Sequence, residues 1–164
     1  MSETLLSMAA VLERLPERPA VKAILAWKPD ALLDAKFDRG ELTLTIAAGE
    51  IRAAAATVQA AGYIFFEDVT AVDWFPSSPR FQLSYHIVSH TYKERIRLRV
   101  LLDGDAPSVE SITSVWPSAN FYEREVFDLF GIGFEGHPNL RRIMMPDDWQ
   151  GHPLRKDYPV EGYR

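Results

Sequence analysis

Alternation of apolar and basic residues within 94–102 constrains the fold more than any other feature of the sequence. The apolar positions of one face are Ile96, Leu98, Val100 and Leu102, and the other face holds Arg95, Arg97 and Arg99. Because successive side chains of a strand point to opposite faces of a sheet, this pattern predicts a strand with one buried and one polar face. We therefore expect a sheet that helices cover on one face and that is open to solvent or a partner on the other.

The rest of the first 130 residues divides into helical and strand-like patterns. The expected helices cover residues 3–14, 20–28, 50–61 and 117–130, and the expected strands cover 33–37, 42–46, 63–75, 81–90 and 94–102. Gly62 and Gly131 are expected to end the last two helices, and the turn at 38–40 makes the first two strands a hairpin. The order ααββαβββα predicts an α+β fold, in which a mixed or antiparallel sheet packs against helices on one face.

The composition excludes several classes of chemistry. The chain of 164 residues contains no cysteine, which excludes disulfides, thiolate zinc sites and cysteine-ligated iron–sulfur clusters within it. Its net charge of −5 argues against a general nucleic-acid binder, which would carry a basic excess. No apolar run approaches the roughly 20 residues needed to cross a bilayer, and the N-terminus lacks the basic residues of a signal or transit peptide. We therefore expect a cytoplasmic protein whose redox chemistry, if any, belongs to a neighbouring chain.

Residues 131–164 follow neither the helical nor the strand pattern, yet they are rich in large apolar side chains. These are Ile132, Phe134, Leu140, Ile143, Met144, Met145, Trp149, Leu154, Tyr158, Val160 and Tyr163. Disordered tails are depleted in such residues, and a structureless segment of this length is uncommon inside a compact domain. We therefore divide the chain into an α+β core domain over 1–130 and an extended partner-binding tail over 131–164.

The length of this tail allows it to fold back onto the core or to cross onto another protein. Fully extended it would span about 110 Å, whereas a core of this size is only about 36 Å across. Burying five of its large apolar side chains would contribute about 7–15 kcal/mol before the cost of ordering. These magnitudes favour a partner protein, although the residues alone leave self-packing open.

The helix before the tail carries paired carboxylates that could serve a metal or acid–base chemistry. Glu125 and Asp128 lie one turn apart on one helix face, but no histidine lies at the Glu-x-x-His spacing of a di-iron helix. We therefore expect a structural role. Glu123 and Glu125 are predicted to accept hydrogen bonds from arginines such as Arg141 and Arg142, which would fix the tail against the helix.

The tail itself offers two histidines and two basic pairs. His137 and His152 each precede a proline, and their spacing is not diagnostic of a zinc site, so we expect them to form turns and donate hydrogen bonds in an interface. The pairs at 141–142 and 155–156 are balanced by equally many acidic residues in the tail. This balance favours ion pairs with a protein over binding of nucleic acid or membrane. The glycines at 131, 133 and 136 match a dinucleotide-binding motif in letters only, because they follow a helix rather than a strand.

Three stretches of this region, read together, resemble a known family. They are Glu123 to Ile132 (EREVFDLFGI), His137 to Ile143 (HPNLRRI) and Pro153 to Pro159 (PLRKDYP). They closely resemble the 30-kilodalton subunit, named C, of the proton-pumping NADH:quinone oxidoreductase, respiratory complex I.

The resemblance implies a non-catalytic, cofactor-free scaffold subunit in the peripheral arm, on the cytoplasmic side of the inner membrane and attached to it only through the complex. The tail is expected to run along the neighbouring subunit that helps to form the quinone site, named D and called the quinone-site subunit below. FMN, iron–sulfur clusters and quinone are expected in other subunits. The signature residues expected at the interface are Glu123, Arg124, Glu125, Asp128, Gly131, His137, Pro138, Leu140, Arg141, Arg142, Trp149, Pro153, Leu154, Arg155, Lys156, Asp157 and Tyr158.

Other interpretations stay open. The same domain occurs in related membrane-bound hydrogenases and in ferredoxin:plastoquinone complexes, so the electron donor is not fixed by the resemblance. The alternative of another class is a free-standing, metal-dependent hydrolase that uses Glu125, Asp128 and His137. A third is a homo-oligomer whose copies exchange tails.

Overall fold

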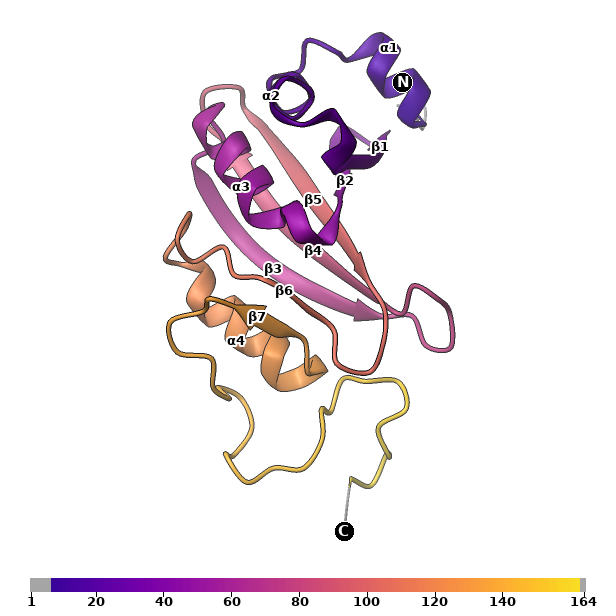
Figure 1. Cartoon of the computed structure of the whole chain (residues 1–164), viewed down its shortest axis with the longest axis vertical. Coiled ribbons are helices and arrows are strands. Elements are labelled where there is room, and N and C mark those ends of the chain that lie inside the picture. Colours follow the sequence, from indigo (N-terminus) through magenta and orange to yellow (C-terminus); the bar gives the residue numbers. More distant parts are fainter. Residues whose placement is uncertain (1–6, 163–164) are drawn as a thin grey trace.

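The computed structural model describes residues 7–162 and confirms the α+β fold (Figure 1). Its helices are α1 Met8–Arg14, α2 Pro19–Trp27, α3 Ile51–Ala60 and α4 Ala119–Phe130, with 3-10 turns η1 Pro29–Ala31 and η2 Ala48–Glu50. Its strands are β1 Leu32–Asp38, β2 Glu41–Ile46, β3 Phe65–Asp73, β4 Phe81–Ser89, β5 Glu94–Leu102, β6 Ser108–Glu110 and β7 Gly133–Glu135. Residues 3–6 of the first expected helix lie outside the described part of the chain. No described helix is long and apolar enough to cross a bilayer.

Five strands form one mixed sheet in the order β1-β2-β5-β4-β3. β2 pairs with β5 in parallel, and every other neighbouring pair is antiparallel. The β1–β2 hairpin turns at Arg39 and Gly40, which have φ angles of 51° and 81°, as a tight two-residue turn requires. On β5 the alternation is as predicted: Ile96 and Leu98 are fully buried, while Arg97 between them lies on the other face and is half-buried.

One face of the sheet is covered by helices. Ile51 and Val58 of α3 and Val126 of α4 share a single apolar core with Leu98 and Leu83 of the sheet. Figure 1 shows α3 crossing in front of the strands and α4 lying along β3 beside β6 and β7, with α2 next to α3 and α1 near β1. The opposite face of the sheet presents the arginines of β5, of which Arg95 is exposed and Arg97 and Arg99 are half-buried, as the alternation on β5 predicted for a half-covered sheet.

The end of α3 confirms the expected glycine cap. Gly62 has a φ of 104°, and its N–H donates to the carbonyl of Gln59 at 3.0 Å. The N–H of Tyr63 donates to the carbonyl of Val58 at 3.1 Å. These two bonds form a Schellman motif, in which a left-handed residue reverses the chain and satisfies the last helical carbonyls.

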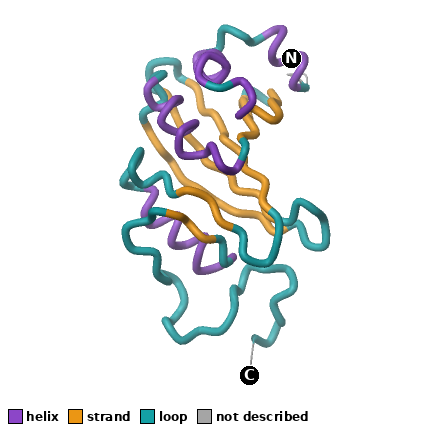
Figure 2. The backbone as a smooth tube through the Cα atoms, in the orientation of Figure 1, coloured by secondary structure: helices purple, strands orange, loops and turns teal. Residues whose placement is uncertain are grey.

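A second, two-stranded sheet was not predicted. β6 and β7 pair in parallel, with Val109 opposite Phe134, and both side chains are buried. Three-residue strands are too short to produce a readable period. β7 lies within the segment that the sequence assigned to the tail, and both Ile132 and Phe134 belong to the core. From Gly136 to Gly162 the chain has no helix or strand, and Figure 2 shows it as a long loop beyond α4.

Candidate partner-binding site

The tail completes the C-terminal end of α4. A helix leaves its last carbonyl groups without intrahelical partners. Here the N–H of Leu154 donates to the carbonyl of Leu129 at 3.0 Å, and Nε of Arg155 donates to that of Phe130 at 2.6 Å. The Arg155 guanidinium also brings a positive charge to the negative end of the helix dipole. The tail therefore serves as the cap of α4, which holds residues 154 and 155 in fixed positions.

Asp128 is the first anchor of the tail. Its buried carboxylate accepts Nη1 of Arg142 at 2.7 Å and the successive backbone N–H groups of Ile143, Met144 and Met145 at 3.0, 2.7 and 2.8 Å. Burial alone raises the pKa of Asp128, but these backbone N–H groups and the guanidinium lower it below its usual value. Asp128 is therefore ionised and acts as the centre around which the chain turns.

The predicted contact between the helix and the tail exists, but the predicted acceptors were wrong. Glu125 is exposed and has no hydrogen bond or ion pair among the described residues. Glu123 points inward rather than toward Arg141 or Arg142. Arg124 instead holds this part of the tail, because its Nε and Nη2 donate to the carbonyls of Arg141 and Arg142, each at 3.1 Å.

Glu123 belongs to a buried polar cluster that also holds the tail. It accepts the hydroxyl of Ser111 at 2.6 Å and the N–H of Ile112 at 2.8 Å. Burial raises the pKa of Glu123 to about 7, although both hydrogen bonds act in the opposite direction. Nε2 of His137 lies 3.9 Å from the Glu123 carboxylate and 3.3 Å from the carbonyl of Asn120.

His137 is held as a neutral hydrogen-bond donor. The N–H of Asn139 donates to its Nδ1 at 3.0 Å, so the ring proton lies on Nε2, which faces the carbonyl of Asn120. Burial lowers the pKa of His137, and the nearby Arg124 lowers it further. His152 likewise donates through Nδ1 to the carbonyl of Asp128, at 2.9 Å. Both histidines thus donate hydrogen bonds, as expected, but to carbonyl groups of their own chain, whereas the expected role was in an interface.

A second anchor lies near the end of the tail. Asp73, at the end of β3, accepts two hydrogen bonds from Arg80, at 3.0 and 2.9 Å, and the N–H of Lys156 at 2.8 Å. Nη2 of Arg80 also donates to Asp157 at 2.7 Å. Burial raises the pKa of Asp73, but Arg80 and the N–H groups of Lys156 and Phe75 together lower it to about 2. Sequence reasoning missed Asp73 and Arg80, because neither lies in a local pattern that points to the tail.

Between these anchors the large apolar side chains of the tail face outward. The exposed fraction is 63% for Met144, 40% for Trp149 and 49% for Leu154. Their neighbours in sequence hold the backbone to the core through polar contacts. The side chains are therefore displayed on an ordered backbone, which lowers the entropy lost when they are covered.

The remaining signature residues complete this description. Pro138, Arg141, Lys156 and Asp157 are exposed, while Leu140, Pro153 and Tyr158 are half-buried. Leu140 packs against the apolar core, and the hydroxyl of Tyr158 donates to the carbonyl of Gln150 at 3.4 Å. Gly131 has a φ of 71°, and a Cβ there would lie 2.5 Å from the ring of His152.

The structure does not assemble the site of the hydrolase alternative. Both carboxylate oxygens of Asp128 are taken by Arg142 and by backbone N–H groups, Glu125 points to solvent, and His137 faces Asn120. Within residues 7–162 no group of three or more histidine, aspartate or glutamate side chains could hold a metal ion.

Comparison with known proteins identifies the family. The family described as "Respiratory-chain NADH dehydrogenase, 30 Kd subunit" matches residues 44–164. The NADH-quinone oxidoreductase subunit named C of Roseiflexus sp. (strain RS-1) is 44% identical over 158 residues, which cover 94% of this chain and 86% of that protein. That of Citrifermentans bemidjiense is 47% identical over 134 residues, which cover 81% and 83%. The chain belongs to the 30-kilodalton subunit family of respiratory complex I.

Solved structures of two related proteins share the fold of this 30-kilodalton-family subunit. A trypsin-resistant fragment of Nqo5 is 35% identical, with a TM-score of 0.58 over 62% of this chain and 83% of that one. A chain of the membrane-bound sulfane sulfur reductase, an archaeal respiratory membrane complex, is 27% identical, with a TM-score of 0.75 over 85% and 84%. The protein is therefore one component of a multi-subunit complex, as its resemblance implied.

Proposed function

We propose that this protein is a non-catalytic scaffold of the peripheral arm of a proton-translocating NADH:quinone oxidoreductase. Its tail docks onto the quinone-site subunit through the outward side chains of Met144, Trp149 and Leu154. One observation carries this proposal: polar groups of the tail bind the core, while these three large apolar side chains face solvent.

The exposed parts of these side chains set the energy available to such docking. These three side chains are already about half buried, so covering the rest contributes about 2–5 kcal/mol gross, roughly half of the 1.5–3 kcal/mol that full burial of each would give. Association and ordering of interface side chains oppose this gain. Because Asp128 and Asp73 already order the backbone of the tail, much of its conformational entropy is lost when the subunit folds and not when it docks.

The proposed role requires the redox groups to lie elsewhere. A chain without cysteine has no thiolate to hold an iron–sulfur cluster, so FMN, iron–sulfur clusters and quinone are assigned to other subunits. The names of the relatives make NADH the proposed electron donor. A related hydrogenase or ferredoxin:plastoquinone complex would use the same scaffold with another donor. The protein is placed on the cytoplasmic face of the inner membrane, attached through the complex.

Co-expression with the quinone-site subunit tests this proposal. Truncation at Gly131 is a poor probe, because it removes Ile132 and Phe134 from the core. The better variant combines Met144→Ser, Trp149→Ser and Leu154→Ser, which spares both anchors. Its matched control carries Leu33→Ser and Ile64→Ser, which change exposed apolar residues of the core domain.

We expect the quinone-site subunit to co-purify in equal amount with the wild type and the control, and to be lost from the tail variant. Equal recovery of the quinone-site subunit with all three proteins would overturn the proposal. A self-dimer of the isolated wild type that the tail variant abolishes would instead support exchange of tails between copies, and would equally contradict it.

A further inference from the structure

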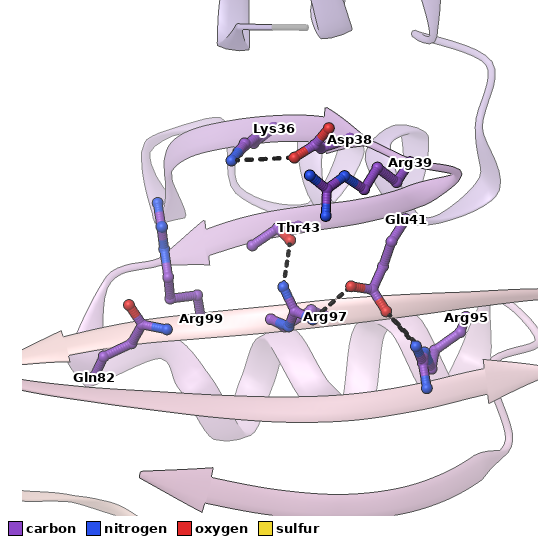
Figure 3. Close-up of a pocket in the computed structure, with 9 residues that line it drawn as sticks. All are labelled: Lys36, Asp38, Arg39, Glu41, Thr43, Gln82, Arg95, Arg97 and Arg99. Carbon is purple, nitrogen blue, oxygen red and sulfur yellow. Dashed lines mark hydrogen bonds and ion pairs between the residues drawn. The ribbon is translucent and has the colours of Figure 1, made fainter. Parts of the chain in front are cut away.

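The open face of the sheet is an ordered array of charged and hydroxyl side chains. Strand pairing places them in rows across the strands: one row runs Lys36, Thr43, Arg97, His86 and Asp68, and the next runs Asp34, Thr45, Arg99, Ser84 and Thr70. A helix lies behind the strands in Figure 3, on the face away from these side chains. A polar face of this kind can be solvated or can be covered by a partner.

Positive charge is concentrated toward the β1–β2 edge of this face. A cavity of about 440 Å³ opens there, as Figure 3 shows. Its charged lining consists of Lys36, Arg39, Arg95, Arg97, Arg99, Asp38 and Glu41. Five cationic against two anionic side chains give this cavity a charge of +3, within a chain whose net charge is −5.

Two of the cations are available to a ligand. Arg39 is exposed at the hairpin turn and has no hydrogen bond or ion pair among the described residues. Lys36 is paired only loosely, with Nζ 3.6 Å from the Asp38 carboxylate. Such exposed pairs contribute little and are easily exchanged for another partner.

The arginines of β5 are held in place by their neighbours. Arg97 donates to His86 Nε2 at 2.9 Å and to the carboxylate of Glu41. Arg99 donates to Thr45 at 2.9 Å and, at the edge of the cavity, to Asp34 at 3.1 Å. Arg95 pairs with Glu41 at 2.8 Å and with Glu67 at 3.7 Å. These contacts fix the guanidinium groups in position, and with Asp34 and Glu67 counted at the rim a positive excess of one charge is left, which corresponds to the unpaired Arg39.

We infer that this cavity is a second docking surface, which accepts an extended acidic segment of a neighbouring subunit of the complex. Arg95, Arg97 and Arg99 stand two residues apart, about 6.7 Å along the strand, which is also the spacing of alternate side chains in an extended peptide. Guanidinium groups bind carboxylates through paired hydrogen bonds. A recessed, positively charged site in a component of a multi-subunit complex fits a protruding acidic segment better than it fits a flat membrane surface.

This surface is independent of the tail. The cavity lies toward β1 and β2, whereas the tail is held by α4 and by the end of β3, at the opposite edge of the sheet. The inference therefore goes beyond the proposed docking on the quinone-site subunit, and each can fail without the other.

Carbodiimide cross-linking of the purified native complex tests the inference. The reagent condenses an amine with a carboxylate in direct contact, forming an amide bond and taking up the lost water to become a urea. We expect mass spectrometry to find Nζ of Lys36 joined to an aspartate or glutamate of another subunit, within an acid-rich peptide. If Lys36 is unreacted, or is joined only to its own chain, the inference is wrong.

Charge reversal supplies the matched comparison. Lys36→Glu combined with Arg39→Glu should lower the salt concentration at which the protein leaves the complex, and should weaken its retention about tenfold, as expected for removing a complementary charged contact. Lys22→Glu with Arg52→Glu makes the same charge change on the helix side and should leave retention unchanged. Equal retention of both double variants would overturn the inference.

Vesicle binding tests the alternative that the ligand is a lipid. If the free wild-type protein binds phosphatidylglycerol vesicles and Lys36→Glu with Arg39→Glu abolishes this binding, the inference is also wrong.

Discussion

Oδ2 of Asp73 accepts the backbone N–H of Lys156 at 2.8 Å, although 83 positions separate the two residues. This bond joins the last residue of β3 to the end of the tail. Arg80 adds a second link, because it donates to both Asp73 and Asp157. The charge on Asp73 therefore helps to hold the end of the tail in position.

Replacing Asp73 with Asn should destabilise the protein and flatten its acid response. The folded pKa of Asp73 is about 2, whereas an unfolded aspartate titrates near 3.9. Its stabilisation is therefore present above about pH 4 and is lost as the pH falls toward 2. We expect the variant to lose about 2 kcal/mol of unfolding free energy at pH 7. Urea denaturation from pH 7 to 2 measures both effects, and identical acid responses of variant and wild type would contradict the assignment.

Replacing Asp128 with Asn should free the middle of the tail without unfolding the core. The variant loses the negative charge that binds Arg142 and the N–H groups of residues 143–145. We expect hydrogen-exchange protection at 143–145 to fall about thirtyfold, equivalent to about 2 kcal/mol. Glu125→Gln, an exposed change on the same helix, should leave this protection intact. Unchanged protection in the Asp128 variant would show that the carboxylate does not hold the tail.

Gly131→Ala and Gly136→Ala form a matched pair. Both glycines have positive φ angles, of 71° and 77°, so alanine costs about 1 kcal/mol of backbone strain at either position. Only at Gly131 would the added Cβ meet side chains of the tail, at 2.5 Å from His152 and 2.8 Å from Arg155. We expect Gly131→Ala to cost about 1–3 kcal/mol more than Gly136→Ala in urea denaturation. Equal costs would mean that the tail does not pack on this end of α4.

Glu123 should respond to pH in the opposite direction to Asp73. Its folded pKa is about 7, above that of an unfolded glutamate near 4.3. Between these values the folded state holds a proton that the unfolded state has released, so stability falls as the pH rises from about 4.5 to 7. Glu123→Gln should remove this slope and raise the unfolding free energy at pH 7 by up to about 3 kcal/mol. A slope that persists in the variant would assign it to another group.

The sequence predicted the elements whose pattern is local. The alternation of Arg97 and Leu98 fixes the two faces of β5, and Gly62 and Gly131 mark the ends of α3 and α4 because left-handed backbone favours glycine. The strand β7 was missed, since three residues carry no period and only pairing with β6 makes them a strand.

The anchors of the tail could be predicted only in part. Arg142 was expected to hold the tail against the helix, but Glu123 and Glu125 were assigned the contact that Asp128 makes, and Asp128 was expected at the interface with a partner protein. The rotation of α4 about its axis decides which carboxylate faces the tail, and that rotation depends on tertiary packing. Asp73 had no signal, because its partner lies at the other end of the chain.

Hydroxyl-radical footprinting of the assembled complex tests the central claim, that the outward side of the tail is covered by the quinone-site subunit. Met144 and Trp149 are exposed in the protein on its own, and both side chains react readily with hydroxyl radicals. We expect their oxidation rates to fall at least about fivefold in the complex, while that of Trp27, an exposed residue at the end of α2, changes less. Equal rates for Met144 and Trp149 in the free protein and in the complex would contradict this claim.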